Sequence, residues 1–126
     1  MNKTIPTPLD PAIESLGSIY MHWIPIMRDI AKTHGYAIAV HGSMQRDCDL
    51  IAIPWIQEAS APITMIKAIR DAIGGCYLHP ERDEKCFSDG NPSKKPHGRL
   101  GYIIHMTTLG GLRPYFDISV IPPTQQ

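Results

Sequence analysis

The most informative stretch of the sequence is Val40-His41-Gly42-Ser43-Met44-Gln45-Arg46-Asp47-Cys48-Asp49-Leu50, which joins two apolar segments. Alternate residues of an extended strand point the same way, so Asp47 and Asp49 would lie on one face, roughly 6 to 7 Å apart. Two carboxylates held that close repel each other, and the pKa of one is raised unless they share a cation. A divalent metal, Mg²⁺ or Mn²⁺, removes that repulsion, and phosphate chemistry commonly uses such a metal.

Upstream of this stretch, apolar side chains recur at three- and four-residue intervals between Asp10 and Gly35, which predicts a helix with one buried face. Pro25 lies inside the pattern, so we expect a kink or a split there. Residues 36–41 are short, apolar and partly β-branched, which predicts a buried strand, and residues 49–55 are expected to be its partner.

Downstream, Ser60 is expected to cap a second helix that ends at Gly74-Gly75. Residues 76–79 fit a short strand. Residues 80–97 have no apolar periodicity and contain several prolines, which predicts a long loop of the kind that is usually mobile or functional. This loop runs into the densest basic cluster of the chain, whose members are Lys94, Lys95, His97 and Arg99.

Two further strands are predicted, over residues 100–106 and 114–121. In the second, Phe116, Ile118 and Val120 alternate with more polar residues. The order helix, strand, strand, helix, loop, strand, strand predicts an α+β domain, with helices packed mainly on one side of a mixed or antiparallel sheet. Trp23 and Trp55 are expected in or near its core.

Length and composition predict one domain over residues 1–126, with extended tails at 1–9 and 122–126. Twelve basic and twelve acidic residues cancel, which argues against an extensive nucleic-acid interface. No apolar run is long enough to cross a bilayer, and the first residues lack the apolar core of a signal peptide. With three cysteines, an odd number, we expect reduced thiols and a cytoplasmic location.

Asp117 lies among apolar neighbours on the polar face of the last predicted strand, where a carboxylate is seldom needed for packing. If this strand lies near Asp47 and Asp49, three carboxylates converge on a site able to hold divalent cations against a triphosphate. Gly42 and Ser43 would lie beside it, where the missing glycine side chain lets a phosphate approach backbone N–H groups.

This pattern resembles the nucleotidyltransferase superfamily that includes DNA polymerase beta, in particular its small stand-alone members. A strand ending in Gly-Ser, an Asp-x-Asp-Leu at the next strand and a third Asp on a later strand carry the resemblance. It covers residues 36–55 closely and 114–121 loosely. One departure is clear: members usually have about ten residues, with a short helix, between Gly-Ser and the first Asp, whereas three residues stand here.

The resemblance implies a nucleotidyltransferase-like domain that moves a nucleotidyl group from a nucleoside triphosphate to a hydroxyl acceptor. Asp47 and Asp49 match the metal-binding pair, and Asp117 matches the carboxylate that helps activate the hydroxyl. The candidate nucleotide-binding residues are Gly42, Ser43, Arg46, Lys95 and Arg99.

Two alternatives stay open for the same scaffold. A catalytically inactive module could bind a nucleotide or a protein, as a phage accessory protein would, with a partner subunit or as a homo-oligomer. A metal-dependent phosphohydrolase could use the same carboxylates. A structural interpretation also remains, in which Asp47 pairs with Arg46 or another base and the Gly-Ser turn is ordinary turn chemistry.

A zinc site could be composed from Cys76, His79 and Cys86 with His41 or His97, although no second closely spaced pair completes it. A half-buried cysteine with loop histidines is the simpler interpretation.

Overall fold

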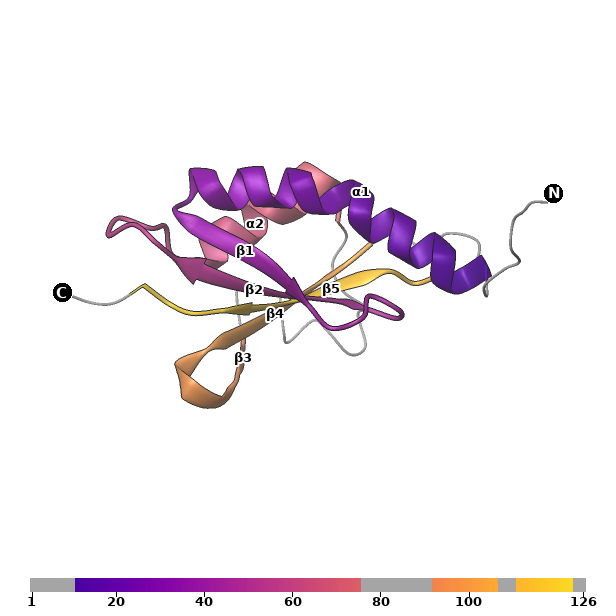
Figure 1. The fold of residues 1–126 in the computed structure, drawn as a ribbon. Helices are drawn as coiled ribbons and strands as arrows, with labels where there is room; N and C mark the ends of the chain where they lie inside the picture. Colours follow the sequence, from indigo (N-terminus) through magenta and orange to yellow (C-terminus); the bar gives the residue numbers. More distant parts are fainter. Residues whose placement is uncertain (1–10, 76–91, 107–110, 124–126) are drawn as a thin grey trace.

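The computed structural model describes residues 11–75, 92–106 and 111–123. Along the chain the elements are α1 (Pro11–Thr33), β1 (Tyr36–His41), β2 (Cys48–Pro54), α2 (Pro62–Ile73), β3 (Ser93–Lys94), the 3₁₀ turn η2 (Pro96–Gly98), β4 (Leu100–His105) and β5 (Tyr115–Val120). The strands form one five-stranded sheet in the order β1-β2-β5-β4-β3. Both long helices lie on the same side of this sheet (Figure 1), which confirms the predicted α+β class.

The sheet is mixed because β5 runs parallel to β2, whereas every other neighbouring pair is antiparallel. The register of the parallel pair places Asp49 beside Asp117. Strands that are far apart in sequence therefore become central neighbours, and this pairing creates the candidate site.

Helix α1 covers the sheet with a stripe of buried residues spaced three and four apart: Leu16, Tyr20, Ile24, Met27 and Ala31. Of the two outcomes expected at Pro25, a kink or a split, the split is not found, since the helix is continuous through this residue. Pro25 is exposed, so water can satisfy the carbonyl that loses its helical hydrogen bond, and the axis bends partway along instead (Figure 1).

The core lies between this helical layer and the inward face of the sheet. Leu50 on β2, Ile118 on β5 and Ile104 on β4 are fully buried there. Residues that alternate with them point to the opposite face, which we call the open face because neither long helix covers it (Figure 1). Within the described residues, no helix is long and apolar enough to cross a membrane.

Several local expectations need correction. Helix α2 has Ala61, not Ser60, at its N-cap, and no side chain caps it. The hydroxyl of Ser60 instead forms a hydrogen bond with Nδ1 of His34 at 2.8 Å. Trp55 is 63% exposed rather than in the core. As predicted, Gly74 ends α2, in a left-handed conformation.

The predicted loop over 80–97 is only partly testable, because residues 76–91 lie outside the described residues, as does the strand expected over 76–79. Its last part is not irregular. Strand β3 pairs antiparallel with β4, and η2 turns the chain between them. The basic cluster thus belongs to a hairpin at the edge of the sheet.

Candidate metal and nucleotide site

Three carboxylates meet on the open face at the end of the central strand pair. Asp49 and Asp117 are register partners on β2 and β5, and Asp47 precedes β2 by one residue. One oxygen from each lies within 4.8 Å of the others, and all three side chains are half-buried. The expectation that Asp117 would lie beside Asp47 and Asp49 therefore agrees with the structure, although their functional roles stay predictions.

The electrostatics of this cluster are unfavourable for three free anions. The pKa of Asp49 is raised, first by its partial burial, then by the charge of Asp47 and a hydrogen bond with it, then by Asp117, while His41 opposes the shift. A cation placed among these oxygens would remove the repulsion. Clustered carboxylate oxygens are the ligands that Mg²⁺ and Mn²⁺ prefer, so the donor set could hold such an ion.

A cation from the chain itself already approaches the cluster. Nζ of Lys95 lies 3.2 Å from Oδ1 of Asp117, and both side chains are more than two-thirds buried. Lys95 reaches the carboxylate across Gly101 of β4, where an added Cβ would lie 2.5 Å from Cε of Lys95. The sequence predicts that Lys95 contacts a nucleotide phosphate, which stays a prediction; in the protein alone its ammonium forms an ion pair with Asp117.

Arg99 follows η2 and also lies over β5. Its Nη1 donates a hydrogen bond to Oγ of Ser119 at 3.1 Å, and its Nε donates one to the carbonyl of Pro96 at 3.2 Å. Ser119 is two residues beyond Asp117 and shares its face of the strand. Arg99 is thus near the acidic cluster but bonded to neutral groups.

Gly42 and Ser43 occupy the tight turn before β2 and have different surroundings. Gly42 has φ +88° and a Cβ added there would lie 3.2 Å from Oδ2 of Asp49, so any other residue would be strained and would crowd the carboxylate. Ser43 is exposed, and its Oγ accepts a hydrogen bond from the N–H of Gln45 at 3.3 Å. Ser43 therefore stabilises the turn, whereas Gly42 lies against the site.

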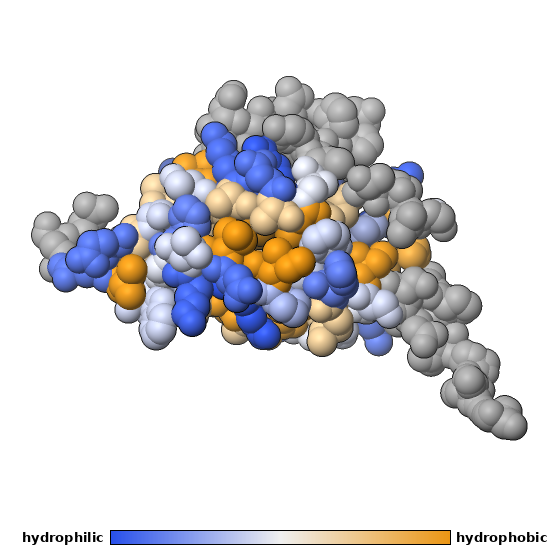
Figure 2. Space-filling model, turned by 90° about the horizontal axis from the view of Figure 1, so that it is seen from above, coloured by the Kyte–Doolittle hydropathy of each residue, from blue (hydrophilic) through white to orange (hydrophobic). Residues whose placement is uncertain are grey.

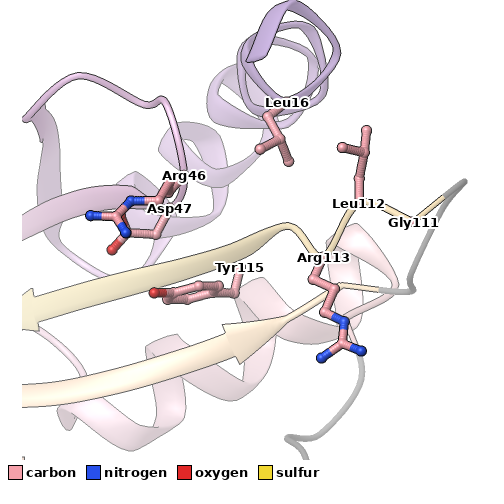
Figure 3. A pocket seen from close by; sticks show the side chains of 7 residues that line it. All are labelled: Leu16, Arg46, Asp47, Gly111, Leu112, Arg113 and Tyr115. Carbon is pink, nitrogen blue, oxygen red and sulfur yellow. The ribbon is translucent and has the colours of Figure 1, made fainter. Parts of the chain in front are cut away.

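A pocket of about 520 Å³ opens beside Asp47 (Figure 3). Leu16 and Leu112 lie above the ring of Tyr115, Arg46 lies next to Asp47 at one end, and the guanidinium of Arg113 points away at the other rim (Figure 3). Its volume is within the range of small-molecule sites. Of the lining residues only Arg46 and Asp47 were predicted from sequence, because only the fold brings Leu16 and Leu112 to β2.

Tyr20 of α1 holds together the two segments that carry the carboxylates. Its hydroxyl donates a hydrogen bond to the carbonyl of Arg46 at 2.7 Å and accepts one from the N–H of Tyr115 at 3.3 Å. Burial raises the pKa of Tyr20 to about 12, so it stays protonated and able to donate. The sequence showed Tyr20 only as a member of an apolar helix stripe, and nothing local signals this second role.

The other candidate groups are less connected. Cys76, His79 and Cys86 lie outside the described residues, so the zinc hypothesis is untested. His41 and His97 are exposed. Cys48 is buried, and this burial together with Asp49 and Asp47 raises the pKa of its thiol to about 12. A thiol that stays protonated at neutral pH is a poor metal ligand and a poor nucleophile.

Comparison with known proteins adds no family. The sequence matches no protein-family model and no curated protein sequence.

Proposed function

We propose that this protein is a divergent, minimal nucleotidyltransferase-like domain that transfers a nucleotidyl group from a nucleoside triphosphate to a hydroxyl acceptor. The observation that carries the proposal is the convergence of Asp47, Asp49 and Asp117, with oxygens within 4.8 Å of one another. A pocket large enough for a nucleoside adjoins Asp47. The Gly-Ser turn and the spacing of the aspartates, which resemble the superfamily, add to this support.

The metal in this proposal is Mg²⁺ or Mn²⁺, held by Asp47, Asp49 and Asp117. When bound, it would neutralise charge on the triphosphate and on the three carboxylates. Because the metal-free cluster raises the pKa of Asp49, we expect metal binding to be weaker at acidic pH, where protons compete for the same oxygens.

The other residues of the site would position the nucleotide and the acceptor hydroxyl. Arg46 lies next to Asp47 on the rim of the pocket, where its guanidinium can pair with phosphate oxygens. Gly42 lets the turn lie directly against the Asp49 carboxylate, since a Cβ there would lie 3.2 Å from Oδ2 of Asp49, and its backbone N–H would face a bound phosphate. Asp117 would orient the attacking hydroxyl and accept its proton. Leu16, Leu112 and Tyr115 supply an apolar wall and an aromatic ring for the base or sugar.

Calorimetric titration of nucleoside triphosphates with and without Mg²⁺ tests the proposal. We expect binding only with metal, and loss of that binding in Asp47→Ala and Asp49→Ala. Asp29→Ala, which changes an exposed aspartate of α1, is the matched control and should bind normally. Binding that survives both site substitutions would contradict the proposal.

The products of the loaded protein separate transfer from hydrolysis. Chromatography after incubation with a nucleoside triphosphate and a range of hydroxyl acceptors should show pyrophosphate and a nucleotidylated acceptor. Release of inorganic phosphate alone would instead assign a metal-dependent phosphohydrolase.

One contact favours a second candidate, a catalytically inactive nucleotide-binding module. The ion pair between Lys95 and Asp117 satisfies part of the cluster without metal, and the short link between Ser43 and Asp47 leaves no helix whose N-terminus could hold phosphate. This candidate predicts nucleotide binding that is independent of Mg²⁺ and no product with any acceptor.

A further inference from the structure

Within the described residues, strand β1 forms one edge of the sheet, and a second groove lies beside this strand. It encloses about 260 Å³ and is lined by Arg28 and Lys32 of α1, by the β1 residues Tyr36, Ala37 and Ile38, and by Trp55. Among the strands that the structure describes, β1 is the first of the sheet and pairs with β2 alone. In Figure 1, β1 runs below α1, and both elements contribute lining residues to the groove.

The hydrogen-bond phase of the β1–β2 pair tells which backbone groups face this groove. The N–H of Trp55 donates to the carbonyl of Gly35 at 3.0 Å, so these two residues form a hydrogen-bonded pair. The antiparallel register continues from this pair without interruption along both strands. Because such bonds recur at every second residue, Ala37 and Ala39 bond to β2, whereas Ile38 and Val40 direct their N–H and C=O outward. Within the described ranges, no hydrogen bond to these outward groups is found.

Exposed apolar side chains concentrate near the same corner. Of the four large hydrophobic residues most exposed in the described chain, three lie at or just beyond the end of β2: Ile53, Trp55 and Ile56. The helical side of the molecule likewise shows apolar residues exposed between polar ones (Figure 2). Trp55 itself lines the groove, so an occupant would cover part of a residue that is now 63% exposed.

The charge of the groove selects among possible occupants. Arg28 and Lys32 are exposed, and no carboxylate pairs with either in the part of the chain that the structure describes. They are one helical turn apart, which separates them by about 6 Å along the axis. Alternate residues of a strand are separated by about 6.6 Å, so two acidic side chains at alternate positions of an added strand match them.

We propose that this groove binds an extended acidic segment of a partner protein, which adds to β1 as a further strand of the sheet. The outward backbone groups of Ile38 and Val40 would supply ladder hydrogen bonds, Arg28 and Lys32 would pair with carboxylates, and Trp55 would pack on an apolar side chain. This is the β-augmentation mode of peptide recognition. It is independent of the acidic site on the open face.

A second copy of this chain fits the same edge less well. Pairing β1 with β1 of another molecule about a two-fold axis would bring Arg28 and Lys32 of both copies to the same seam. Like charges facing each other across such a seam oppose association. The two basic residues therefore favour an acidic partner over self-association.

The test uses a blocked peptide of alternating valine and glutamate, titrated against the full chain while Trp55 fluorescence is followed. A peptide of alternating valine and lysine is the control for charge. We expect saturable binding of the glutamate peptide and none of the lysine peptide. Trp23→Phe removes the other tryptophan signal, so the change can be assigned to Trp55.

Two sets of variants locate the binding. Arg28→Glu with Lys32→Glu should weaken binding about tenfold, because each exposed ion pair contributes a factor of a few. The charge reversal Lys67→Glu on exposed Lys67 of α2 is the matched control and should leave affinity unchanged. Val40→Pro removes one outward donor and should also weaken binding, whereas Val40→Thr keeps that donor and should not.

Should Val40→Pro fail to fold, N-methylated glutamate peptides provide the same test from the ligand side. One peptide is methylated at the backbone nitrogens of its glutamates and the other at those of its valines. The N–H groups of alternate residues point to opposite edges of a strand, so one of the two peptides loses the donors that face β1 and must bind more weakly. The proposal is overturned if the lysine peptide binds equally, if the Arg28/Lys32 reversal has no effect, or if neither methylated peptide is weakened. Sedimentation showing a dimer that Val40→Pro dissociates would overturn it in favour of a second copy.

Discussion

The two faces of the central strand pair differ more than any other two regions of the molecule. On the helical side, Leu50, Phe116 and Ile118 are fully buried. Their neighbours along the same strands, Asp49 and Asp117, point to the open face. The pKa of Asp49 is raised there, and Asp117 forms an ion pair with Lys95. Burial of one face therefore stabilises β2 and β5 strongly enough for the other face to hold side chains that repel each other.

The largest expected effect is on the buried face. Phe116→Ala removes a fully buried ring that packs edge-to-face on Tyr20 at 5.3 Å. We expect the free energy of unfolding to fall by about 3 to 5 kcal/mol, measured by urea denaturation. The control Ile103→Ala, on the open face and half-buried, should lose clearly less. Equal losses would mean that the two faces bury their side chains to the same extent.

A smaller effect is expected from Tyr20→Phe, which keeps the ring but removes the hydroxyl that joins Arg46 to Tyr115. Loss of these hydrogen bonds should cost about 1 to 2 kcal/mol of unfolding free energy. It should also weaken Mn²⁺ binding, followed by paramagnetic relaxation, because the two carboxylate-bearing segments lose their common anchor. A Tyr20→Phe protein with unchanged metal affinity would show that the hydroxyl supports only the core.

The contribution of the Tyr20 hydroxyl to the free energy of unfolding should fall as the pH rises. Its pKa is raised in the folded state from 10.0 to about 12, so the folded protein holds this proton more tightly. The stability that the hydroxyl adds is fully present below pH 10 and is lost as the pH rises toward about 12. The stability difference between the wild type and Tyr20→Phe should therefore shrink over that interval.

On the open face, removing a side chain's charge is expected to raise the stability of the protein instead of lowering it. Asp49→Asn removes a carboxylate whose pKa is raised by burial and by Asp47, so without metal the variant should be more stable by about 0.5 kcal/mol. The stability of the wild type relative to the variant is highest at low pH and is lost as the pH rises through the folded pKa of Asp49. Thermal unfolding in chelator measures this, with Asp29→Asn as the neutral control. A destabilised Asp49→Asn would mean that the carboxylate is held by favourable contacts.

Only a small stability change, of less than about 1 kcal/mol, is expected at Lys95, since its ion pair is partly exposed. Lys95→Met should nevertheless tighten Mn²⁺ binding, because the ammonium competes with metal for Asp117. Lys94→Met, which removes the exposed neighbouring charge, should leave metal affinity unchanged. If both variants behave alike, the effect is one of general charge and not of the Asp117 contact.

Much of the fold could be predicted from sequence because it depends on periodicity. The stripe in α1 and the alternation around Phe116 are local patterns, and the helices and long strands are found close to the predicted bounds. The errors fall where a tertiary contact outweighs a local signal. Ser60 has the residue type of a helix cap, but His34 engages its hydroxyl.

The candidate site divides in the same way. The spacing of Asp47 and Asp49, two residues apart, is enough to predict that they lie close together, and the polar position of Asp117 in an apolar strand is unusual. The ion pair of Lys95 could not be predicted, because it requires β3 to fold back on β4 and Gly101 to leave room for the lysine stem.

By itself the sequence determined which side chains share a face of each element, since this follows from the fixed repeat of helix and strand. Only the tertiary structure decided that β5 lies beside β2, in parallel, with Asp117 opposite Asp49. That choice depends on burying the apolar faces of strands 60 residues or more apart, a property of the whole chain that no short pattern contains.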